Sequence, residues 1–148
     1  QDLSKIDVKE YIQDLANLIL NSFNQGEQAL KINYDLKPVH CLIDTLVPLE
    51  LVINDLLTNA IQHPLLGRSQ GNIYIAAENS DNGELVVEIS DDGVGMPEDL
   101  EPARTDSIGL QIVKNVVELQ LNGRVELERA GGTTWRLYID TGSYYERV

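Results

Sequence analysis

The sequence predicts a two-layer α/β sandwich, with a mixed, mostly antiparallel sheet of about five strands covered on one face by three helices. The chain has 148 residues, of which 43% are hydrophobic and 24% charged, so it can bury one ordinary core. Five segments alternate apolar and polar residues with the strand period, and three others repeat apolar residues with the helix period. Because each strand presents one apolar face, we expect the helices to cover that face alone.

The five predicted strands are residues 30–36, 73–77, 85–89, 125–127 and 133–139. The turn-forming residues 79–83 join the second strand to the third, and the pair Gly131-Gly132 joins the fourth to the fifth. Both connections are typical of antiparallel hairpins. Residues 39–43 are a weaker candidate for a sixth strand.

Two helices precede the middle of the chain. The first begins at Asp7, which forms a capping-box pattern with Glu10 three residues later. The second runs from about Pro48, in its first turn, to His63. The apolar positions of the first helix follow the helical period: Val8, Ile12, Leu15, Ile19 and Phe23.

The third predicted helix starts near Ser107 and ends before residues 122–123, an Asn-Gly pair that is typical of a helix stop. Residues 96–106, which precede it, contain two prolines and few apolar side chains, so we expect a loop there.

The composition excludes several classes of protein. Eleven basic residues against 24 acidic ones give a formal net charge of −13, which disfavours general binding to nucleic acid. A single cysteine, Cys41, excludes an internal disulfide and fits a reducing compartment. No apolar run reaches the roughly 20 residues of a membrane span, and the first residues lack a signal-peptide pattern. Because Lys and Arg are scarce, an anionic ligand would need Mg²⁺, backbone N–H groups and helix ends to hold it.

The second helix carries polar residues at the margin of its apolar arc. Asp55 and Asn59 are four residues apart, so they stack on that margin, and His63 falls inside the arc. This placement suits residues that line a cleft. A helix margin with two solvated polar residues and a packed histidine explains the same pattern.

Glycines follow two of the predicted elements. Asp91, Asp92, Gly93 and Gly95 come directly after a strand, where glycines let the backbone turn and approach a ligand, although a plain Asp-Gly turn fits as well. Gly109 lies in the first turn of the third helix, where exposed N–H groups can hold phosphate, or where a small residue simply packs.

These motifs, in this order, resemble the ATP-binding domain of sensor histidine kinases, in the GHKL superfamily with the Bergerat fold. Residues 54–63 resemble its N box, residues 91–95 its first glycine box, and residues 107–113 its second glycine box in a one-glycine form. The resemblance covers about residues 45–140, and residues 7–44 agree only in layout.

The resemblance implies a role for each polar residue. Asn59 would offer its amide oxygen to Mg²⁺, a cation that prefers oxygen ligands. Asp55 would position a metal-bound water or act as a base. Asp91 would accept a hydrogen bond from the adenine amine, which disfavours guanine. The loop that starts at Met96 would be the ATP lid. The ATP-binding residues it implies are Asn59, His63, Asp91, Gly93, Gly95, Met96, Ser107, Ile108, Gly109, Leu110 and Thr133.

The sequence departs from the wider family at three places. Thr105 and Ser107 stand where many members have glycines, and the lid contains no phenylalanine. Gln62 replaces a basic residue that is commoner before the histidine, and Arg104 or Arg68 could supply the missing phosphate contact.

The resemblance implies a cytoplasmic catalytic domain that binds Mg-ATP and phosphorylates a histidine on a separate helical dimerisation domain, which then feeds a response regulator. Residues 1–6 are interpreted as the end of a linker, and residues 7–148 as one kinase domain without membrane insertion. An anti-sigma-type serine kinase, an ATPase of the chaperone or topoisomerase kind and a nucleotide-sensing domain are alternatives. We expect neither His40, predicted to be partly buried, nor His63 to be the phosphoacceptor.

Overall fold

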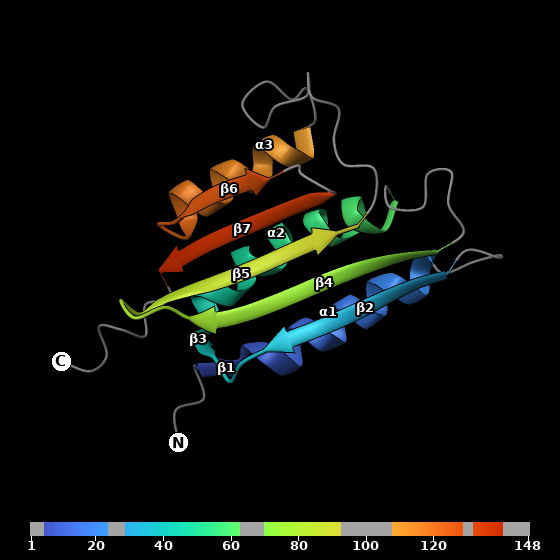
Figure 1. Ribbon diagram of the computed structural model, residues 1–148. Coiled ribbons are helices and arrows are strands. Elements are labelled where there is room, and N and C mark those ends of the chain that lie inside the picture. The colour runs from blue at the N-terminus through green and yellow to red at the C-terminus, as the bar shows by residue number, and fades with distance from the viewer. Residues whose placement is uncertain (1–4, 24–28, 63–69, 93–107, 129–131, 141–148) are drawn as a thin grey trace.

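The computed structural model describes residues 5–23, 29–62, 70–92, 108–128 and 132–140. A five-stranded sheet forms one layer and the helices pack on one of its faces, which confirms the predicted fold class (Figure 1). The strand order is β2-β4-β5-β7-β6. The first pair is parallel and the other three are antiparallel. The strands are β2 (Ala29–Leu36), β4 (Gln70–Asn79), β5 (Glu84–Asp91), β6 (Arg124–Glu128) and β7 (Thr133–Asp140).

Both predicted antiparallel pairings are present. In the turn between β4 and β5, the Ser80 N–H donates to Glu84 O at 2.8 Å, and Gly83 adopts a φ of 88°. Glycine tolerates this left-handed conformation, which explains its place in the turn. β6 pairs with β7 from Arg124–Tyr138 to Glu128–Thr134, while Gly131 lies outside the described residues.

A second, two-stranded sheet stands apart from the main one. β1 (Lys5–Asp7) pairs antiparallel with β3 (His40–Leu42), so the weak sixth strand exists but does not join the main sheet. Along β3 the side chain of His40 is exposed and that of Cys41 is buried. The expected partial burial of His40 was wrong, because neighbouring residues of a strand face opposite sides.

Helix α1 (Val8–Phe23) begins where the sequence predicts. The Asp7 carboxylate accepts hydrogen bonds from the N–H groups of Lys9 and Glu10, at 3.0 and 3.4 Å, and so caps the first turn. Among the predicted apolar positions, Val8, Ile12 and Ile19 are buried in the core and Leu15 is partly buried.

Helix α2 (Ile43–Gln62) begins earlier than predicted and contains Pro48 beyond its first turn. A proline there lacks the N–H that would bond to the carbonyl four residues back, so local rules place it at the start of a helix. Leu46, which precedes Pro48, is 7% exposed and belongs to the core. Burial of Leu46 together with Leu49 therefore favours the additional turn.

Helix α3 (Ile108–Asn115) continues into η1 (Val116–Gln120), a π-helical segment that the sequence did not predict. The predicted stop after it is confirmed. Asn122 adopts a φ of 50°, and the Gly123 N–H donates to Val117 O at 2.9 Å. This left-handed residue followed by glycine closes the carbonyl end of the segment.

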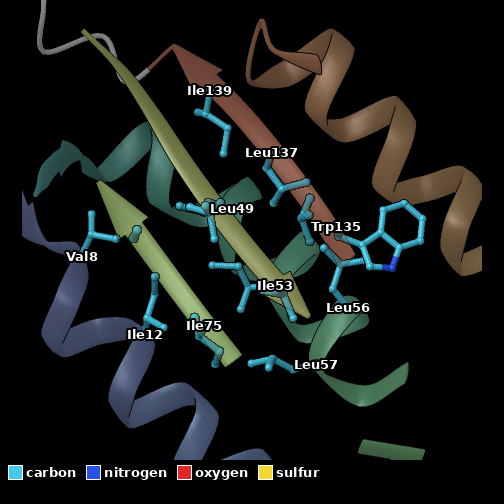
Figure 2. Packing of buried hydrophobic residues seen from close by; sticks show 14 of the residues in the cluster. Val8, Ile12, Leu49, Ile53, Leu56, Leu57, Ile75, Trp135, Leu137 and Ile139 are labelled. Atoms are coloured by element: carbon cyan, nitrogen blue, oxygen red, sulfur yellow. The ribbon is translucent and has the colours of Figure 1, made fainter. Parts of the chain in front are cut away.

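The core lies between the sheet and the helices. Figure 2 shows side chains from α1, α2, β4 and β7 meeting in this layer. Its fully buried members include Ile12, Leu49, Ile53, Leu56, Leu57, Ile75, Leu137 and Ile139. Because this core fixes α2 against the sheet, it also fixes every polar residue on the margin of α2.

Candidate functional site

Four element ends that are distant in the sequence meet at one edge of the molecule. The C-terminal ends of α2 and β5 lie there with the N-terminal ends of β7 and α3 (Figure 1). α2 packs against both β5 and α3. The described parts of the three motifs, which are residues 54–62, 91–92 and 108–113, therefore extend to the same edge.

On α2, Asp55 and Asn59 occupy the predicted margin. Both side chains are half-buried, whereas Leu56 and Ala60, the residues that follow them, are buried. Burial raises the pKa of the Asp55 carboxyl above its ordinary value. A carboxylate with raised proton affinity is better suited to accept a proton than an ordinary surface aspartate.

On the sheet, Asp91 and Thr133 form the last cross-strand pair between β5 and β7. Asp91 has the same strand parity as Ile89, and Thr133 has that of Trp135, so both side chains face the helical layer. Thr133 is 8% exposed and is the one polar residue classed as buried in the described part of the chain. The pair brings a carboxylate and a hydroxyl together beneath the end of α2.

The backbone approaches closely at Gly132, directly before β7. Gly132 adopts a φ of 129°, and a Cβ built on it would lie 2.0 Å from Asp91 O and 3.0 Å from Asp91 C. Only a residue without a side chain fits there. The glycine predicted as part of a tight hairpin is therefore also the residue that lets β7 begin against Asp91.

Several of the other predicted ATP-binding residues lie outside the residues that the structure describes. His63, Gly93, Gly95, Met96 and Ser107 lie outside the described residues, as do Arg68, Arg104 and Thr105. The helix α3 starts at Ile108 and includes Gly109 and Leu110. Their roles stay predictions.

Comparison with known families decides the wider assignment. Residues 44–143 match the model of the histidine kinase-, DNA gyrase B- and HSP90-like ATPases. The chain belongs to this ATPase family.

Two curated relatives are a histidine kinase and an anti-sigma factor. The chain is 30% identical over 115 residues to Blue-light-activated histidine kinase 2 of Erythrobacter litoralis, covering 78% of this chain and 33% of that protein. It is 40% identical over 62 residues to an anti-sigma F factor of Bacillus licheniformis, covering 42% of this chain and 41% of that protein. The chain therefore spans less than half the length of either relative.

A solved structure agrees with the fold. The histidine kinase domain of the Erythrobacter litoralis EL346 blue-light-activated histidine kinase superimposes with a TM-score of 0.83 and 26% sequence identity. The match covers 95% of this chain and 64% of that one. As a member of this ATPase family, the chain is an ATP-binding domain of the kind that histidine kinases contain.

The donor set at this edge fits a hard cation bound together with phosphate. In residues 5–92 and 108–140, apart from the gaps between described segments, no group of three or more His, Cys, Asp or Glu side chains could hold a metal alone. Asp55 and Asn59 offer oxygen atoms one helical turn apart. Mg²⁺ prefers oxygen ligands and retains water and phosphate in its other positions, so one or two protein oxygens suffice. No described helix is long and apolar enough to cross a membrane.

Sequence reasoning missed three polar residues at this edge of the ATPase domain. Asn33, Asn72 and Asp92 form hydrogen bonds that link β2, β4 and the end of β5. In the sequence, Asp92 stands out only as the neighbour of Asp91. A signal existed in Asn72, a polar residue of low strand propensity directly before the apolar positions of β4.

Proposed function

We propose that this chain is the catalytic domain of a sensor histidine kinase, which binds Mg-ATP and transfers the γ-phosphoryl group to a histidine on a separate helical domain. The observation that carries the proposal is the placement of Asp91 and Thr133 on the helix-facing side of the sheet, at the edge where α2, the helix that carries Asp55 and Asn59, ends. The histidine kinases among its relatives favour this branch of the ATPase family.

In the proposed complex, Asp91 reads the base. Its carboxylate accepts a hydrogen bond from the exocyclic amine of adenine, and Thr133 adds a hydroxyl on the neighbouring strand. Guanine presents a carbonyl at the same position, so two acceptors would face each other. Asp91 therefore favours ATP over GTP, whereas the Thr133 hydroxyl can donate or accept and does not discriminate between the bases.

In the same complex, Asp55 and Asn59 of α2 lie beside the phosphates. Asn59 would hold Mg²⁺ through its amide oxygen, and the ion would neutralise phosphate charge in a chain whose net charge is −13. Asp55, one turn earlier and with a raised pKa, positions water or accepts a proton. Catalysis rests on positioning, as is general for phosphoryl transfer.

The placement of His40 supports an acceptor outside this domain. His40 is exposed, but it lies on β3, at the end of the sandwich opposite to the end of β5 (Figure 1). In-line transfer requires the acceptor within roughly 3–3.5 Å of the phosphorus. A residue built into the far end of the same rigid domain does not meet that requirement. The acceptor histidine, and beyond it the aspartate of a response regulator, belong to other domains in this proposal.

Phosphorylation of serine is the second candidate, because the match to the anti-sigma F factor covers 62 residues at 40% identity. Incubation with γ-labelled ATP and Mg²⁺, with and without the helical domain of the parent protein, tests both. We expect no stoichiometric label on this chain alone and acid-labile, alkali-stable label on the helical domain.

Other outcomes separate the alternatives. Acid-stable, alkali-labile label on an added protein would favour a serine kinase. Released phosphate without any labelled protein would favour a simple ATPase, and bound but intact ATP would favour a nucleotide sensor. Stoichiometric acid-labile label on this chain alone would contradict the separate acceptor.

A further inference from the structure

We propose that Asp92 is a positioning residue that orients Asp91 toward the nucleotide. It does so through hydrogen bonds between its carboxylate and Asn72 on the neighbouring strand, a contact that we call the clasp. The inference rests on the proposed function, in which Asp91 reads adenine. It concerns two acidic residues that are adjacent in sequence and whose side chains lie on opposite faces of the sheet.

The side chains of Asp91 and Asp92 point to opposite faces of the sheet. Asp91 faces the helical layer together with Ile89. The Asp92 carboxylate instead accepts a hydrogen bond from Asn72. Because Asn72 alternates with the buried residues Gly71 and Ile73, the Asn72 side chain lies on the face of the sheet opposite the helices, which we call the open face. Fixing Asp92 on the open face therefore fixes the peptide that presents Asp91 on the other face.

Three hydrogen bonds between Asn72 and Asp92 form the clasp. The Asn72 N–H donates to Asp92 Oδ1 at 2.9 Å, and Asn72 Nδ2 donates to Asp92 Oδ2 at 3.0 Å. The Asp92 N–H donates back to Asn72 O at 3.2 Å. Both carboxylate oxygens are thus used by one residue, in charge-assisted hydrogen bonds that are stronger than neutral ones.

Asn33 on β2 supports Asn72 through hydrogen bonds. Asn33 Nδ2 donates to Asn72 Oδ1 at 3.4 Å and to Ile73 O at 3.3 Å. Because the amide oxygen of Asn72 accepts from β2, its Nδ2 is the group turned toward Asp92. The clasp is therefore anchored across three strands.

The clasp lies directly beyond the last pair of the ladder between β4 and β5. The ladder between β4 and β5 ends at the pair Ile73–Asp91, so the clasp extends it by one residue. On the other side, Gly132 packs against Asp91 O. The next residue in the sequence, Gly93, has no side chain with which to hold the backbone. Within the described residues, Asp92 is the last residue of this segment, and its side chain holds the backbone directly after Asp91.

A charge-conserving exchange tests the clasp. In Asp92→Asn, one of the Asn72 donors faces a new donor, and in Asn72→Asp two carboxylates face each other. We expect each single variant to lose roughly tenfold in ATP affinity and part of its preference for ATP over GTP. In the double variant, the amide at position 92 donates to the carboxylate at position 72 while its oxygen accepts the N–H of residue 72, so both properties recover.

Glu88→Gln is the matched control. It removes one negative charge from the same face of β5, where Glu88 accepts a hydrogen bond from Arg136 at 2.7 Å. We expect unchanged nucleotide preference. All variants are compared by isothermal titration with ATP and GTP in Mg²⁺, at a temperature where circular dichroism shows each one folded.

Amide hydrogen exchange in the nucleotide-free protein separates failure of this inference from failure of the proposed function. We expect faster exchange at the N–H of residue 72 in Asp92→Asn and recovery in the double variant. Faster exchange with wild-type ATP and GTP affinities would overturn the positioning role alone. Unchanged exchange would overturn the clasp. A wild-type chain that binds no adenine nucleotide would overturn the proposed function, and the role of Asp92 with it.

Discussion

At the scale of single residues, Asp55 combines its proposed role in phosphoryl transfer with a cost in folding stability. Its carboxylate is half-buried, and desolvation raises its folded-state pKa above the unfolded value. The charged form is therefore disfavoured by folding, so this residue lowers stability as the pH rises from about 4 through the raised folded pKa. Below the unfolded value the carboxyl is protonated in both states and the effect vanishes.

We therefore predict opposite effects of Asp55→Asn on stability and on activity. The variant should be more stable than wild type at pH 7 in urea unfolding, with the gain disappearing near pH 3. It should slow phosphoryl transfer to the helical domain by roughly 10²-fold or more, because the amide cannot accept a proton. Asp14→Asn, at an exposed position of α1, is the control and should change neither quantity. A less stable Asp55→Asn variant, or one with the wild-type transfer rate, would argue against this account.

At the scale of elements, β7 is held by glycines near both of its ends. A Cβ at Gly123 would lie 1.9 Å from Tyr138 O, and one at Gly132 would lie 2.0 Å from Asp91 O. We predict that Gly123→Ala and Gly132→Ala each lower the free energy of unfolding by roughly 1–3 kcal/mol, because backbone must move in both. Only Gly132→Ala should also lower ATP affinity in the folded protein, since only Gly132 abuts Asp91. Equal ATP affinities in the two folded variants would contradict this coupling of β7 to the site.

The elements also show which parts of the fold local sequence can predict. The five main strands follow from alternation, because half of each strand faces the core. The start of α2 did not follow, since Pro48 obeys a local rule while the burial of Leu46 is a tertiary effect. The π-helical turn at Val116 leaves no local signal. The pairing of β1 with β3 is likewise a contact between segments far apart in the chain.

The same distinction applies to the site. Periodicity placed Asp55 and Asn59 on the margin of one helix. Asp91 was predicted only to follow the strand 85–89, whereas β5 extends to Asp91 and turns its side chain toward the helices. The clasp between Asn72 and Asp92 could not be predicted, because it depends on the register between β4 and β5 and on support from β2.

At the scale of the whole molecule, the two ends of the sandwich have different contents. One end joins the termini of α2, β5, β7 and α3, and the other holds the small β1–β3 sheet (Figure 1). Because the net charge of the chain is −13, the groups that stabilise an anionic ligand must be concentrated at one site. The central claim is that this place is the end where β5 stops and β7 starts.

Backbone amide chemical shifts followed during a titration with Mg-ATP test that claim most directly. We predict saturable shifts at Asn59, Asp91 and Thr133, with the amides of β1 and β3 unchanged, because these lie at the opposite end. GTP at the same concentration should give weaker shifts at Asp91. Saturable shifts confined to β1 and β3, or no saturable shifts anywhere, would contradict the account.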